Sequence, residues 1–205
     1  VAVGVPLGIL AASRAGGLGD KLVMVLTSVG VALPNFWIAM IFVVIFALNR
    51  SWFPATGFVS PFEDPLAALW YATLPAVALA ASGMAEVGRQ LRSSLVETLH
   101  SQHFRTLHAK GLPFRSILWK HGLRNVSVNL LTVISLLISR TLAATVVVEV
   151  VFAIPGMGNT IVNATLQRDF PVVQGAVLVM VLTVITVNLV TDILYSILDP
   201  RIAQQ

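Results

Sequence analysis

Four long apolar stretches restrict this chain to a membrane protein. They cover Leu22–Leu48, Pro65–Gly88, Val126–Ala153 and Val172–Leu198. Each is long enough for a helix to cross a hydrocarbon core about 30 Å thick. Because lipid offers no hydrogen-bond partners, a spanning segment must satisfy its own backbone groups, and a helix does so. We therefore predict an all-α fold: one transmembrane domain over residues 1–205, built as a polytopic helical bundle.

The composition points the same way. Hydrophobic residues make up 57% of the 205 residues and charged residues only 11%, whereas a soluble domain has about a quarter of its residues charged. The net charge of +4 does not indicate nucleic-acid binding, because the basic residues lie in connections beside apolar stretches, where they orient a membrane protein. Without cysteine, disulfides and thiolate metal sites are excluded.

The first residues are interpreted as the end of a further span. Val1–Ala12 is apolar but only about 18 Å long as a helix, which is too short to cross. The segment also lacks the basic region that begins a signal peptide. We expect the N-terminal part of the bundle to be missing from this sequence, which then contains five crossings.

Charge bias orients these crossings. One side carries the connections 13–21, 89–125 and 199–205, and the other carries 49–64 and 154–171. The first side has ten Lys/Arg and the second has only Arg50 and Arg168. Since Lys and Arg are enriched in cytoplasmic connections, the first side is predicted to be cytoplasmic.

The connection over residues 89–125 is predicted to be a cytoplasmic binding element. It holds all four histidines and seven basic residues: Arg89, Arg92, Arg105, Lys110, Arg115, Lys120 and Arg124. The apolar spacing predicts an amphipathic helix with a face formed by Leu95, Leu99, His103 and Leu107, with Val96 and Phe104 beside it. Gly111 is predicted to end this helix.

A second short helix is predicted to begin at Pro113. Its shared face would comprise Phe114, Ile117, Leu118 and His121. Such a helix pair fits a groove on a soluble partner, or it lies on anionic lipid headgroups. Periodicity does not distinguish these two possibilities.

Charge within the apolar stretches is costly and indicates function, and we consider three of the charged residues there. Arg140 lies near the middle of its stretch, Glu149 toward the external end and Asp192 near the cytoplasmic end. Arg140 and Glu149 are expected on opposite helix faces. For Arg140 we consider a place beside a water-filled path, a structural ion pair, or a side chain that reaches the membrane interface.

We predict that the chain is not an enzyme and binds no cofactor or metal. Its lysines, Lys21, Lys110 and Lys120, are each followed by a residue other than Ser or Thr, so a Walker A motif is absent. The histidines lie outside the apolar stretches, which disfavours the haem-binding anchor of a redox complex. An ion-coupled secondary transporter is one possible function of such a chain, although it would need carboxylates deep in the spans.

Three blocks of sequence resemble one family. The first comprises Phe104–Leu112 and Ile117–Asn125, the second Glu149–Gly158 and Arg168–Gly175, and the third Asn188–Tyr195 and Leu198–Ile202. In this order they resemble the permeases of binding-protein-dependent ABC importers, in particular the dipeptide, oligopeptide and nickel subfamily. The resemblance covers most of residues 90–202.

The resemblance implies a multi-pass permease of the bacterial inner membrane, with a type I ABC importer core and six spans in the complete protein. It implies import of short peptides, with nickel chelates or other small solutes as alternatives. The implied partners are a second homologous permease subunit, two cytoplasmic ABC ATPases and an external substrate-binding protein. ATP and Mg would be bound by the ATPases.

The same resemblance implies that residues 95–124 dock on an ATPase and couple its closure to the spans. The residues implied in coupling are Leu99, His103, Phe104, Arg105, Leu107, Ala109, Lys110 and Gly111. The general importer motif begins with Glu-Ala-Ala and closes near a proline, whereas this chain has Arg105-Thr106-Leu107 and Arg124 at those places. We carry over the docking role but not an acidic contact at its start.

Overall fold

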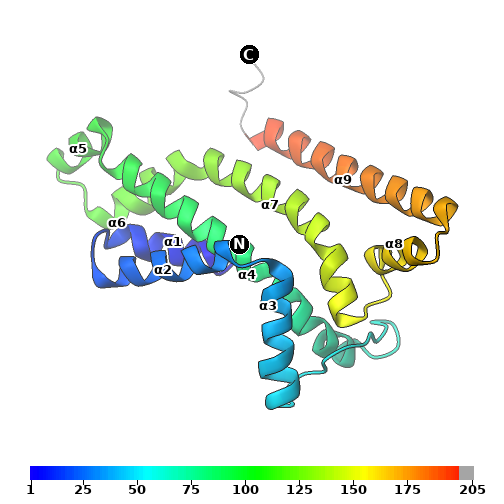
Figure 1. Cartoon of the computed structure of the whole chain (residues 1–205). Helices are drawn as coiled ribbons and strands as arrows, with labels where there is room; N and C mark the ends of the chain where they lie inside the picture. The colour runs from blue at the N-terminus through cyan, green and yellow to red at the C-terminus, as the bar shows by residue number, and fades with distance from the viewer. Residues whose placement is uncertain (199–205) are drawn as a thin grey trace. The chain divides into compact units, whose positions relative to one another are not determined.

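The computed structural model describes residues 1–198 as a series of helices, and these residues contain no strand. The predicted all-α fold is confirmed. In chain order (Figure 1), the elements are α1 (Gly4–Ser13), α2 (Leu18–Ala32), α3 (Asn35–Phe42), the π-helical η1 (Val43–Asn49), α4 (Pro65–Leu99), α5 (Gln102–Ala109), α6 (Phe114–Ser116), the π-helical η2 (Ile117–Gly122), α7 (Leu123–Phe152), α8 (Met157–Leu166) and α9 (Phe170–Leu198).

Three helical segments are long and apolar enough to cross a membrane: Pro65–Leu99, Phe114–Phe152 and Phe170–Thr191. The stretch Leu22–Leu48, which was predicted as one span, forms two helical segments. The chain leaves helical geometry after Ala32 and resumes it at Asn35. Only together are α2 and α3–η1 long and apolar enough to cross a membrane. Pro34 has an extended backbone at the break (φ −62°, ψ 143°) and no N–H to donate to a preceding turn.

The helix that contains Pro75 behaves differently from the segment around Pro34. α4 continues through Pro75 and past the predicted end at Gly88 to Leu99. Membrane helices tolerate an internal proline because neighbouring groups and local adjustments satisfy the freed carbonyl.

Two compact units make up the helical chain. The first comprises residues 1–32, 83–137 and the end of α9 from residue 195, and the second comprises residues 33–82 and 138–194. A single transmembrane domain over residues 1–205 stays a prediction.

In the first unit, α1 and α2 form a hairpin whose first helix packs closely on α4. A Cβ atom added to Gly4 would lie 2.7 Å from the carbonyl oxygen of Met84, and one added to Gly8 would lie 2.8 Å from that of Gly88. Only glycine permits this approach of two backbones. A buried apolar cluster extends the contact to the start of α7 and consists of Ile9, Ala12, Leu91, Leu95, Leu118 and Val126.

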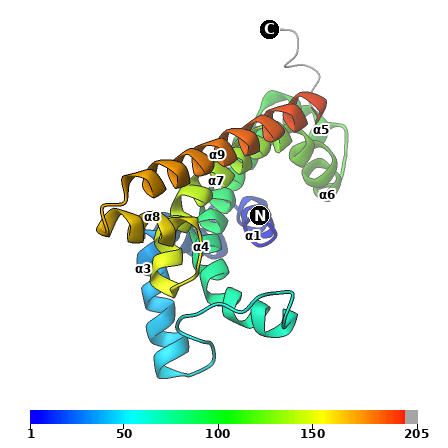
Figure 2. The same cartoon turned by 90° about the vertical axis from the view of Figure 1, so that its right-hand side faces the viewer.

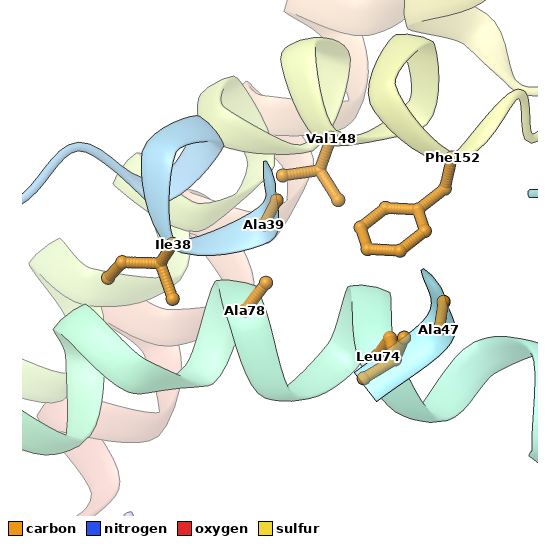
Figure 3. Close-up of a cluster of buried hydrophobic side chains, with 7 residues drawn as sticks. All are labelled: Ile38, Ala39, Ala47, Leu74, Ala78, Val148 and Phe152. Atoms are coloured by element: carbon orange, nitrogen blue, oxygen red, sulfur yellow. The ribbon is translucent and has the colours of Figure 1, made fainter. Parts of the chain in front are cut away.

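The core of the second unit joins α3, η1, the first half of α4 and the end of α7. Figure 3 shows its buried side chains, which are Ile38, Ala39, Ala47, Leu74, Ala78, Val148 and Phe152. The connection between η1 and α4, residues 50–64, is rich in aromatic residues and is attached to this core. Gly57 donates its N–H to the carbonyl oxygen of Phe152 at 2.9 Å, and Phe53 stacks on Trp70 with ring centroids 4.5 Å apart.

Candidate functional site

The predicted cytoplasmic binding element contains one short helix, α5, held between α4 and the long helical segment that begins at Phe114. The prediction of a single helix running from Leu95 to Leu107 was wrong, because α4 ends at Leu99 and α5 begins at Gln102. His100 ends α4 with a hydrogen bond between its Nδ1 and the carbonyl oxygen of Val96, 2.7 Å apart. Ser101 has the extended backbone of an N-cap residue.

Phe104 anchors α5 to the rest of the first unit. Its side chain is only 1% exposed, and its ring meets that of His103 edge to face at 5.3 Å. Figures 1 and 2 both show α5 next to α6, and the helix contacts η2. The predicted apolar face was therefore wrong in one respect: His103 is exposed and Phe104 takes the buried position, while Leu99 and Leu107 are half-buried.

Gly111 closes α5 in a left-handed conformation, with φ +76°. Gly111 N–H donates to the carbonyl oxygen of His108 at 2.9 Å, and Leu112 N–H donates to that of Leu107 at 3.4 Å. These two bonds define a Schellman motif, which satisfies the last carbonyls of a helix. The predicted helix end at Gly111 is confirmed. No heavy atom lies within 4 Å of a Cβ placed there, so the backbone angle and not the available space requires glycine.

The second short helix expected after Pro113 is instead the beginning of a long one. Pro113 is an N-cap residue with an extended backbone, and helical structure then continues from Phe114 to Phe152. Ile117 and Leu118 are buried at its start, and Leu118 packs in one cluster with Leu91 and Leu95 of α4. Leu118 therefore attaches the segment to α4 and not to a separate partner.

The remaining predicted coupling residues lie on or next to α5. Arg105, Ala109, Lys110 and Gly111 are all exposed, as is His103. The structure therefore brings the predicted set together as a small helix that is buried through Phe104 and presents mostly polar and basic residues outward. Its outward surface therefore carries positive charge through Arg105 and Lys110.

Glu149 has a local role that the sequence analysis missed. One of its carboxylate oxygens, Oε2, accepts hydrogen bonds from the backbone N–H groups of Gly158 at 2.7 Å and Asn159 at 3.3 Å. These groups belong to the first turn of α8, whose N-cap residue, Gly156, has no side chain to accept them. Glu149 of α7 thus supplies the missing cap, and its negative charge suits the positive end of the helix dipole.

The match to known proteins covers nearly the whole chain. Residues 4–204 match the family described as binding-protein-dependent transport system inner membrane component. This chain belongs to that family. A putative peptide transport system permease protein of Brucella abortus is 38% identical over 202 residues, which are 98% of this chain and 64% of the relative. The dipeptide transport system permease protein DppB of Bacillus subtilis is 39% identical over 199 residues, 97% of this chain and 62% of the relative.

A third relative, the oligopeptide transport system permease protein AppB of Bacillus subtilis, is 36% identical over 203 residues, 98% of this chain and 64% of the relative. The chain spans slightly less than two thirds of the length of these relatives. Its family comprises membrane components of transport systems and is not a catalytic one, and its long apolar helices agree with a multi-pass protein of the inner membrane.

The other two charged residues predicted inside the spans of this inner membrane component are Arg140 and Asp192. Arg140 lies on α7 in an exposed position. The side chain of Asp192 lies outside the described residues, although its backbone continues α9. Among the described residues, no group of three or more His, Cys, Asp or Glu side chains has the geometry to hold a metal ion.

Replacing Glu149 tests its capping role in this inner membrane component. Glu149→Ala is expected to destabilise the first turn of α8 by about 1 kcal/mol, because two backbone N–H groups lose their acceptor. Hydrogen exchange at Gly158 and Asn159 should accelerate, whereas Glu149→Gln should keep part of the protection through its amide oxygen. Equal protection in the alanine variant and the unsubstituted protein would contradict the cap.

Sequence reasoning also missed a salt bridge between Asp20 and Arg92. Asp20 is only 3% exposed and its carboxylate is held by the Arg92 guanidinium, with Oδ2 and Nη2 2.6 Å apart. The two residues are 72 positions apart. No periodic pattern connects positions so distant, so only the packing of the α1–α2 hairpin on α4 reveals the pair.

Proposed function

We propose that this chain is a permease subunit of an ATP-driven importer of short peptides, and that residues 95–124 couple it to a cytoplasmic ATPase. The printed names of its relatives, which are peptide, oligopeptide and dipeptide transport system permease proteins, support the substrate class. The family's description as a component of a transport system supports an assembly with other subunits. It does not favour the alternative of an ion-coupled transporter.

One structural observation carries the coupling role. α5 is a short helix anchored by buried Phe104, closed by the left-handed turn at Gly111, and outwardly basic through Arg105 and Lys110. A docking element that is already ordered loses little conformational entropy when it binds. Its position between two helices of spanning length gives a mechanical connection from a docked partner to the membrane region.

The energy for transport must then come from a partner. ATP and Mg would be held by two ATPase subunits, and a second homologous permease would complete the path for peptides delivered by an external binding protein. Binding of ATP can shift the permease only if the ATP-bound and ATP-free ATPases prefer different conformations of it. α5 is the proposed element through which this preference acts.

The intramembrane charges have a subordinate place in the proposal. We propose that Arg140 lines the translocation path, because its exposed position on α7 would be costly against lipid and suits a water-filled path. Asp192 stays a path candidate from its sequence position. For Glu149 the capping of α8 supports a structural role at the edge of such a path.

Copurification with the ATPase subunits tests the docking role. In the full-length protein, Arg105→Glu is expected to reduce the amount of ATPase retained by about tenfold, because it reverses a charge on the docking helix. Arg89→Glu is the matched control, since Arg89 is an exposed arginine on α4 and not on α5. Full retention by Arg105→Glu, or equal loss in both variants, would contradict docking through α5.

Labelling of single cysteines tests the predicted orientation. Ser101 and Thr56 are both exposed, and residues 1–205 contain no cysteine that would add background. An impermeant thiol reagent should label Ser101→Cys only from the cytoplasmic side and Thr56→Cys only from outside, because the connection that contains Ser101 carries most of the positive charge. The reverse pattern would invert the topology.

A further inference from the structure

The salt bridge between Asp20 and Arg92 is bidentate and holds the two side chains in one relative orientation. Arg92 donates two hydrogen bonds, from Nε to Oδ1 of Asp20 at 2.9 Å and from Nη2 to Oδ2 at 2.6 Å. Gly16 adds its backbone N–H to Oδ2 at 2.8 Å. Such a fork holds the planar groups in one relative orientation, which a single contact does not. Both carboxylate oxygens are therefore engaged at the start of α2.

The Asp20–Arg92 salt bridge lies beside the buried cluster of the first unit. Arg92 is next to Leu91 in the sequence, and Leu91 and Leu95 are buried in the cluster that joins α1, α4 and the start of α7. The close contacts of Gly4 and Gly8 with α4 already hold α1 in place. The salt bridge adds a polar connection between α4 and α2, the helix that follows α1.

Net stability does not explain this arrangement well. Taking a carboxylate out of water costs free energy that its attraction to a guanidinium often only balances, so a buried ion pair is weak evidence for stability. The geometry of the pair instead fixes the position of α2 along α4, because a bidentate contact allows only one relative orientation of the two side chains. An apolar contact would permit small sliding movements.

Arg92 is also close in the chain to the proposed docking element. α4 continues without a break from Arg92 to Leu99, and only His100 and Ser101 separate it from α5. A displacement of α5 would therefore reach Arg92 through the last residues of α4, and would reach α2 through the salt bridge.

We propose that Asp20 and Arg92 are a positioning pair that makes the α1–α2 hairpin move with the cytoplasmic end of α4 when an ATPase displaces α5. The inference rests on the coupling role proposed for α5 and extends the coupling path to a connection, residues 14–17, that the docking helix does not include. The pair acts through α4 and does not itself contact the ATPase or the substrate.

The test measures peptide imported per ATP hydrolysed, in proteoliposomes that contain the full-length protein assembled with its partner subunits. Asp20→Asn is expected to leave assembly intact and to lower this ratio about tenfold, within the range of ordinary coupling free energies. Arg92→Lys keeps the charge but loses the fork, so a smaller fall is expected. Lys21→Gln and Arg89→Gln, which remove exposed neighbouring charges, are the controls and should keep the unsubstituted ratio.

A double variant shows whether the two residues act as one unit. Asp20→Asn combined with Arg92→Gln should lose no more than either single substitution, because each already breaks the same contact. The positioning role would be overturned if the two substitutions lowered the ratio of peptide imported to ATP hydrolysed independently, so that their effects multiplied. An unchanged ratio in assembled variants, or failure of Arg92→Lys to assemble, would also overturn it. If the unsubstituted complex shows no ATP-driven uptake, the proposed function itself fails, and this result is distinct from a failure of the pair alone.

Discussion

Gly111→Val is expected to abolish most ATP-driven uptake while the long apolar helices remain inserted. Gly111 has φ +76°, a conformation that a β-branched side chain strongly resists. The strain, about 1–3 kcal/mol, would be relieved by opening the Schellman turn, so α5 would lose its fixed direction. Uptake and substrate-stimulated ATP hydrolysis should both fall, as measured with the full-length protein and its ATPases in proteoliposomes.

Gly111→Asn is the matched control for this experiment. Asparagine adopts the left-handed conformation far more readily than valine, and the space around Gly111 is open, so this variant should keep most of the uptake. Undiminished uptake by Gly111→Val would contradict a coupling role for the turn. Equal loss in both variants would show that the side chain, and not the backbone angle, causes the defect.

Gly158→Val is expected to have the largest effect on the folded protein. A Cβ atom at Gly158 would lie 2.4 Å from the Cα atom of Val146, which belongs to the backbone of α7 and cannot rotate away. α8 would have to separate from α7, at a cost of about 3 kcal/mol. The same movement would pull the Gly158 N–H from the Glu149 carboxylate. The amount of monodisperse protein in detergent, and its melting temperature, should both fall.

Gly175→Val provides the corresponding control. Gly175 is also a helical glycine, near the start of α9, but a Cβ atom there meets nothing within 4 Å. This variant should therefore retain the yield and melting temperature of the unsubstituted protein. If Gly158→Val proved as stable as Gly175→Val, the close packing of α8 on α7 would be wrong.

The helix α5 illustrates how far local sequence signals extend. The pattern around Gly111 predicted a helix end, and the structure has one there because the turn depends on hydrogen bonds within a few residues. The same pattern did not place Phe104 inward and His103 outward. That choice depends on η2, which α5 contacts after the chain has turned back.

Pro34 and Pro75 show what a local sequence signal does not decide. Pro34 lies at a break between helices and Pro75 lies inside α4, although each removes the same backbone donor. A proline in a membrane helix kinks it, ends it or is absorbed according to what surrounds it. The residue type alone therefore could not separate the interrupted segment from the continuous one.

By itself, the sequence determined that this protein is a helical membrane component, which stretches are apolar and where α5 ends, because hydropathy and turn chemistry act over short stretches of chain. Only the tertiary structure decided that Glu149 caps α8 and that Asp20 binds Arg92. Each of these carboxylates finds its partner through the packing of one helix on another. Such partners depend on distances in space, which the order of residues along the chain does not contain.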